Sequence, residues 1–110
     1  MAKAPITKEI QAEVTAIIDA FNKKTFKGST DVLYMANFKA NFLYPGRKEY
    51  ELFSPVARLK YTGDINNWEF AIFKWSSETY DPDEWMFPGS NHVNGTIEGA
   101  MKAGLAAYPV

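Results

Sequence analysis

The sequence predicts an α+β fold, with an N-terminal helix, a three- to four-stranded antiparallel sheet, a long ordered loop and a C-terminal helix. Apolar residues follow helical spacing at the two ends of the chain and alternate along its middle. The length of 110 residues is close to the commonest size of one domain. We therefore expect residues 1–110 to form a single domain around one core.

The first helix is predicted over about residues 7–24. Thr7 is its expected N-cap, and Gly28 follows the last turn, where glycine commonly ends a helix. Lysines gather near this end, where positive charge offsets the helix dipole. The apolar stripe that would face the core consists of Ile6, Ile10, Val14, Ile17, Ile18 and Phe21.

Three strands are expected in the middle of the chain. Alternating apolar and polar residues predict a strand over about 32–44, ended by a turn at Pro45. A second strand is expected over 50–61, with Pro55 interrupting its first half because proline has no N–H. The third, over 68–75, is apolar on both faces. Such patterning is typical of a central strand that is covered on both sides.

A last helix is predicted to begin after Thr96, its expected N-cap, and to end before Pro109. An interior glycine costs a helix about 1 kcal/mol relative to alanine. We therefore expect this helix to approach the sheet or another helix closely in return. The small residues that would allow the approach form a stripe of Gly99, Ala100, Ala103, Gly104 and Ala107.

The segment 76–95 joins the last strand to the last helix and is rich in aromatic and acidic residues. Compact domains seldom contain connections longer than about 12–15 residues unless these are functional or disordered. Disordered segments lack aromatic residues. The sequence therefore predicts an ordered cover over the face of the central strand that the first helix leaves open.

Four carboxylates in this segment have two interpretations. Glu78, Asp81, Asp83 and Glu84 could gather around Mg²⁺ or Ca²⁺, which take oxygen ligands. Alternatively, Asp81 caps a short helical turn over 82–86 with acids in its first turn. We favour the cap, because the calcium-loop spacing with its central glycine is absent. We expect neither a metal nor a cofactor.

A catalytic interpretation depends on the only histidine, His92, with Asp83 and Glu84 as acid and base candidates. No nucleophile elbow, phosphate-binding loop or zinc-protease motif accompanies them. A loop histidine without a special role is the simpler interpretation. Whether the protein is an enzyme is left open by the sequence.

Aromatic residues make up 15% of the chain, more than one small core usually encloses. Some are therefore expected at a groove or a subunit contact. Arg58 is a candidate anion-binding residue beside Trp68, although an ordinary surface ion pair with the acidic segment is the favoured interpretation. The other candidate ligand-binding residues are Trp75, Tyr80, Asp81 and Trp85.

Charge, cysteine content and hydropathy limit the kinds of partner and compartment that are expected. The net charge of −1 argues against general nucleic-acid binding, which normally requires a basic surplus. The chain has no cysteine, which fits a reducing compartment. No stretch approaches the apolar length of a membrane span. We expect a cytoplasmic protein that contacts neither membrane nor, in general, nucleic acid.

The sequence therefore predicts a non-catalytic binding or interaction domain that forms a homodimer, through sheet edges or through the small-residue stripe. Its further partner would be a small molecule or a protein. The alternative is a small hydrolase or isomerase whose pocket lies between the sheet and the 76–95 loop. A third hypothesis, with less support, is single-stranded nucleic-acid binding on exposed sheet aromatics near Arg58 and Lys60.

Overall fold

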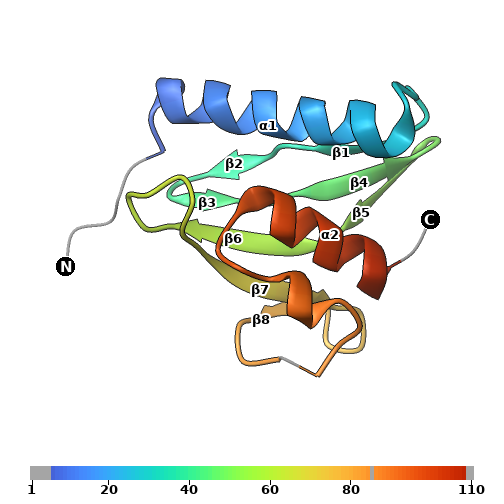
Figure 1. The fold of residues 1–110 in the computed structure, drawn as a ribbon. Helices are drawn as coiled ribbons and strands as arrows, with labels where there is room; N and C mark the ends of the chain where they lie inside the picture. Colours follow the sequence, from blue (N-terminus) through green and yellow to red (C-terminus); the bar gives the residue numbers. More distant parts are fainter. Residues whose placement is uncertain (1–5, 85, 109–110) are drawn as a thin grey trace.

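The computed structural model describes residues 6–84 and 86–108, and these form an α+β fold (Figure 1). The predicted N- and C-terminal helices are confirmed. In chain order the elements are α1 (Lys8–Phe26), β1 (Val32–Met35), β2 (Phe38–Lys39), β3 (Phe42–Leu43), β4 (Gly46–Glu49), β5 (Leu52–Pro55), β6 (Ala57–Tyr61), β7 (Trp68–Lys74), β8 (Thr79–Asp81), the 3₁₀ turn η1 (Ser90–His92) and α2 (Ile97–Ala107).

The strands form two antiparallel sheets, β1-β4-β5 and β2-β3-β6-β7-β8, and not the single three- to four-stranded sheet predicted. The number is larger because three chain segments bend and contribute one strand to each sheet. Pro45 and Pro55 lie at two of the bends, where their missing N–H groups interrupt the ladder. The three bent segments are 32–39, 42–49 and 52–61.

Pro45 therefore lies at a bend inside a strand segment, and the prediction of a turn at this residue is wrong. The chain reverses earlier, between β2 and β3, where Ala40 adopts a φ of 54°. Hydrogen bonds continue through the bend, from Tyr44 N to Asn37 O (2.7 Å) and from Ala57 N to Pro45 O (3.4 Å). The predicted 32–44 strand is in fact β1 followed by a short hairpin.

Local capping explains where both helices begin. The Thr7 side chain accepts a hydrogen bond from Ile10 N (3.2 Å), and the Thr96 side chain accepts one from Gly99 N (3.0 Å). α1 ends at Lys27, which adopts a left-handed conformation with φ 54°. No helix in the described part of the chain is long and apolar enough to cross a membrane.

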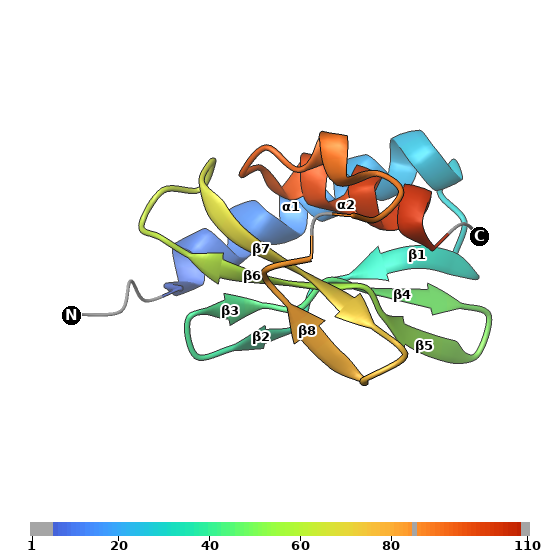
Figure 2. The same ribbon diagram turned by 90° about the horizontal axis from the view of Figure 1, so that it is seen from below.

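Both helices lie on one side of the strands (Figure 2). The small-residue stripe of α2 faces the protein's own core, as its buried Ala100 and Ala103 show. At Gly104 the approach is very close, since a Cβ built there would lie 2.5 Å from Tyr34 Oη. The Tyr34 hydroxyl in turn donates a hydrogen bond to Met101 O (2.8 Å). This confirms the close approach that the glycines of α2 predicted.

The segment after β8 extends the helical layer and does not cover the other face of the sheet. Phe87 stacks on the core residue Phe70, with 5.9 Å between ring centroids, and Gly89 packs against α2 at Ala103. The predicted short helix over 82–86 is also absent among the described residues. Instead Asp81 ends β8 and its side chain accepts a hydrogen bond from Asp83 N (2.9 Å), which makes a tight turn.

Candidate functional site

The face of the larger sheet that points away from the helices carries two of the candidate residues, Arg58 and Tyr80. Residues paired directly across an antiparallel ladder share a face. Arg58 pairs with Ala71, and Phe73 pairs with Tyr80, on the face opposite the buried core. We call the side chains gathered there the open-face cluster: Phe42, Tyr44, Arg58, Phe73 and Tyr80.

The rings of this cluster reach across the sheet. Tyr44, which directly follows β3, lies 5.4 Å from Tyr80 on β8, measured between ring centroids, and Tyr80 lies 5.1 Å from Phe73. Three strand spacings separate β3 from β8, a span of about 14 Å in a flat sheet. The sheet must therefore curl so that these side chains meet. Packing within this cluster leaves Ala71 and Phe73 only 2% and 8% exposed.

Arg58 is held between two aromatic rings in this cluster. Its guanidinium carbon lies 5.0 Å from the centroid of Phe42 and 5.8 Å from that of Tyr80, distances typical of cation–π contact. Within residues 6–84 and 86–108, no side chain forms an ion pair with Arg58. Lys60 lies on the same face, opposite Glu69. The face therefore offers aromatic surface with a fixed positive charge.

Trp68, expected beside Arg58, lies on the helix side of β7. It is 3% exposed, and its indole N–H donates to Ile65 O (2.7 Å). Tyr61 packs against it, with 4.8 Å between ring centroids. Trp75 directly follows β7 and is 52% exposed beside Phe73. The candidate residue Trp85 lies outside the described residues.

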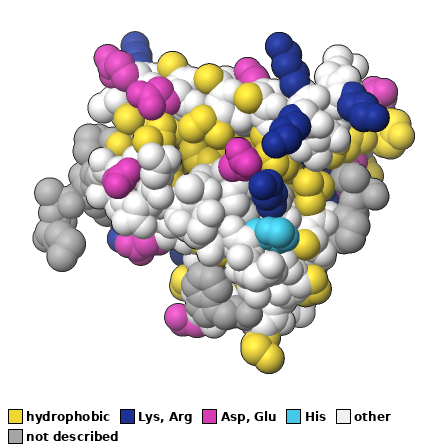
Figure 3. Space-filling view, in the orientation of Figure 1, with side chains coloured by type: hydrophobic (Ala, Val, Ile, Leu, Met, Phe, Trp, Pro, Cys, Tyr) yellow, Lys and Arg dark blue, Asp and Glu magenta, His cyan; other side chains and the backbone are white. Residues whose placement is uncertain are grey.

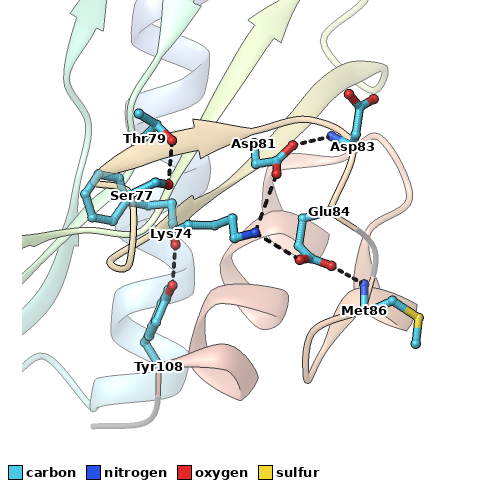
Figure 4. Close-up of polar contacts among 9 residues, drawn as sticks. Lys74, Ser77, Thr79, Asp81, Asp83, Glu84, Met86 and Tyr108 are labelled. Carbon is cyan, nitrogen blue, oxygen red and sulfur yellow. Dashed lines mark hydrogen bonds and ion pairs between the residues drawn. The ribbon is translucent and has the colours of Figure 1, made fainter.

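Two of the acidic candidates, Asp81 and Glu84, surround Lys74 at the rim of the sheet (Figure 4). The Asp83 carboxylate points away from Lys74. Lys74 Nζ lies 3.7 Å from Asp81 Oδ2 and 3.3 Å from Glu84 Oε2. Glu84 also accepts a hydrogen bond from Met86 N (2.8 Å) through its other oxygen. No group of three or more side chains suited to metal binding occurs among the residues described, so this structure adds nothing to the metal interpretation.

The charges at this rim stabilise one another in their ionised forms. The Met86 N–H and the Lys74 ammonium lower the pKa of Glu84, and Glu84 raises the pKa of Lys74. Each shift favours the charged form and moves the group further from neutrality. Lys74, Asp81 and Glu84 therefore form a surface ion-pair cluster at the rim.

His92 lies in η1, exposed on the surface beside the helices (Figure 3). No hydrogen bond or ion pair in the described ranges joins it to Asp83 or Glu84. In the part of the chain that the structure describes, the three predicted catalytic candidates are thus not joined by side-chain hydrogen bonds or ion pairs. A pocket of about 230 Å³ does lie between the sheet and the loop, with Lys74 and Glu84 in its wall. Its Tyr108 hydroxyl donates to the carbonyl of Phe73.

The structure adds one polar residue that sequence reasoning missed. Arg47 is 2% exposed and lies in a pocket of about 310 Å³ at the C-terminal end of α2. Its position in β4 opposite Tyr34 on β1 is fixed by strand pairing. In the sequence it resembles any surface arginine beside a turn-like Pro-Gly pair, so no local signal marks it.

Comparisons with known proteins give no independent guide to this site. No family model matches the chain, and searches of the curated proteins and of the solved structures find no significant match. The assignment of function therefore depends on the surfaces and pockets described above.

Proposed function

We propose that this chain is a cytoplasmic, single-domain, non-catalytic binding protein that works as a homodimer. The observation that carries the proposal is the free edge of β5. Among the described strands, β5 pairs with β4 alone, which leaves its other side without a strand partner. Leu52 and Phe53 on this strand are 73% and 51% exposed. Exposed apolar edge strands are templates for pairing with another chain.

The neighbourhood of β5 extends the apolar surface. Tyr50, in the turn before the strand, is 69% exposed, and Trp75 shares a pocket wall with Ser54 and Pro55. The small-residue stripe of α2, the other predicted contact, is packed against the core. The edge is therefore the better candidate for a subunit contact.

Twofold symmetry suits this strand. An antiparallel pair of identical strands is isologous, so each copy presents the same residues to the other. Leu52 pairs with Glu49 and Phe53 with Lys48, which places the two apolar side chains on opposite faces of the strand. Each apolar cross-strand pair contributes about 0.2–1 kcal/mol. We expect a dimer of moderate affinity, with both open-face clusters on the same side of the joined sheet.

The open-face cluster is then the surface offered to further partners. Its curled aromatic face with the held Arg58 suits a ligand that combines flat apolar and anionic groups. The alternative, a small hydrolase or isomerase, has the pocket between sheet and loop in its favour. Its three catalytic candidates, however, are not joined by any hydrogen bond or ion pair in the described ranges, which favours the binding function.

Light scattering after gel filtration, at tens of micromolar protein, tests the dimer. Wild type is expected near twice the chain mass of 12.4 kDa. Leu52→Lys should give the monomer mass, because it replaces an apolar side chain of the contact by a charged ammonium group that dimerisation would have to bury. Met86→Lys is the matched control, since Met86 is 93% exposed and belongs to the segment after β8 rather than to β5, and it should remain dimeric. A monomeric wild type, or a Leu52→Lys variant that remains dimeric, would contradict the proposed dimer.

A further inference from the structure

The pocket around Arg47 has charged groups at one side and an apolar wall at the other. Arg47 and Ser54 are direct cross-strand partners on β4 and β5, so both side chains are on the helix side of the smaller sheet. Glu49 is the third polar residue of the lining. The apolar wall is made of Pro55, Val56, Trp75, Ala107 and Tyr108.

Arg47 has unused hydrogen-bonding capacity although it is buried. One guanidinium nitrogen, Nη2, donates to the carbonyl of Tyr108, and the guanidinium carbon lies 5.7 Å from the Tyr34 ring centroid. Its Nε and Nη1 atoms have no hydrogen-bond partner in the described residues. A buried donor left unpaired costs about 1–3 kcal/mol, and more when it is charged. An acceptor that enters the pocket removes this cost.

Glu49 supplies the opposite charge beside it. Its Oε1 atom lies 3.7 Å from Arg47 Nε, which is close enough for attraction and too far for a hydrogen bond. The Glu49 side chain is 30% exposed. A plain anion in this pocket would be repelled by Glu49, and a plain cation by Arg47. A ligand that carries both charges a few ångströms apart satisfies both groups.

We propose that this pocket binds a free α-amino acid with an apolar side chain. The ligand carboxylate accepts hydrogen bonds from Arg47 and Ser54, and its ammonium group donates to Glu49. The ligand side chain then packs on Trp75 and Val56. The volume of about 310 Å³ is at the small end of the range for ligand pockets, which suits a single amino acid better than a peptide.

This site goes beyond the proposed function, because it requires neither the dimer nor the open-face cluster. Isothermal titration with three probes tests it: L-leucine, leucinamide, which lacks the carboxylate, and N-acetyl-leucine, which lacks the ammonium. Leucine should bind, and each analogue should bind at least about tenfold more weakly. If leucine at millimolar concentration gives no binding heat, the proposal is overturned. Equal affinity for N-acetyl-leucine also overturns it, since the site would then recognise a carboxylate alone.

A charge variant separates recognition from folding. Replacement of Arg47 would leave the Tyr108 carbonyl without its donor, so Glu49→Gln is the better variant. Glu49→Gln should weaken leucine binding about tenfold, because the ligand ammonium loses its acceptor. It should strengthen N-acetyl-leucine binding, because the repulsion between Glu49 and the ligand carboxylate is removed. A purely structural Glu49 would not produce these opposite changes. Glu51→Gln, on the same hairpin and outside the lining, should leave both affinities unchanged.

The two proposals fail independently. Leucine binding by a wild type that is monomeric would overturn the dimer and support the pocket. A wild type that is dimeric but gives no binding heat with leucine would support the dimer and overturn the pocket. Glu49→Gln that binds leucine as wild type does would overturn the role of Glu49, and with it the zwitterion proposal.

Discussion

Gly104→Ala should destabilise the protein, although alanine is the better helix former. A Cβ at this position would lie 2.4 Å from Val56 Cγ1 and 2.5 Å from Tyr34 Oη. Both neighbours are 1% exposed, so neither side chain can swing into solvent. The substitution therefore forces the core or α2 to shift.

The magnitude follows from three contributions. Alanine gains about 1 kcal/mol of helix propensity over glycine. Overpacking costs about 1–3 kcal/mol. Displacement of the Tyr34 hydroxyl from Met101 O loses a hydrogen bond worth about 1 kcal/mol. The net expectation is a loss of about 1–3 kcal/mol in the free energy of unfolding.

Urea unfolding followed by circular dichroism measures this loss. The transition midpoint should fall while the m-value stays constant, because the surface exposed on unfolding is unchanged. Gly104→Ala should lower the free energy of unfolding by less in a Tyr34→Phe background, because the hydroxyl that the new Cβ would meet is absent there. Ala20→Gly, at an exposed position of α1, is the control for ordinary propensity and should lose about 1 kcal/mol. An unchanged or higher stability of Gly104→Ala would refute the packing at this contact.

Three further predictions concern other parts of the fold. Burial raises the pKa of Tyr34 from 10.0 to about 12, so its contribution to stability is complete below pH 10 and is lost as pH rises to about 12. In urea titrations over this pH range the stability of Tyr34→Phe should decline less than that of wild type, and an identical decline would contradict the assignment to Tyr34. Phe87→Ala removes the stack on Phe70 and should speed amide exchange over 86–95, whereas unchanged exchange would show that another contact holds the segment. Arg58→Met should lose about 0.5–1 kcal/mol of cation–π energy in the same urea assay, and no loss would mean that the ring contacts are energetically neutral.

Local sequence patterns were sufficient to predict the two helices and parts of the core. Helical spacing and threonine caps were sufficient to predict α1 and α2, because these signals act over a few neighbouring residues. The glycines of α2 correctly indicated a close approach. The aromatic content of 76–95 indicated contact with the core, and Phe87 provides it. It did not indicate which face would be covered, since an aromatic ring packs equally well on either side of a sheet.

Strand number and register could not be read from the sequence in the same way. Pro45 follows an alternating run, a pattern that a turn and a bend produce alike. Which of the two forms depends on the neighbouring strand, through bonds such as Ala57 N to Pro45 O. The bend then decides how many strands there are and where the edge at β5 lies.

The chain's own sequence thus determined an α+β chain with capped helices and a two-sided apolar strand, because spacing and capping are short-range. Only the tertiary structure decided that Arg58 lies between Phe42 and Tyr80, and that Arg47 is buried beside Glu49. These neighbours come from different strands. Their meeting depends on ladder register and sheet curl, which are set by the burial of the whole core at once.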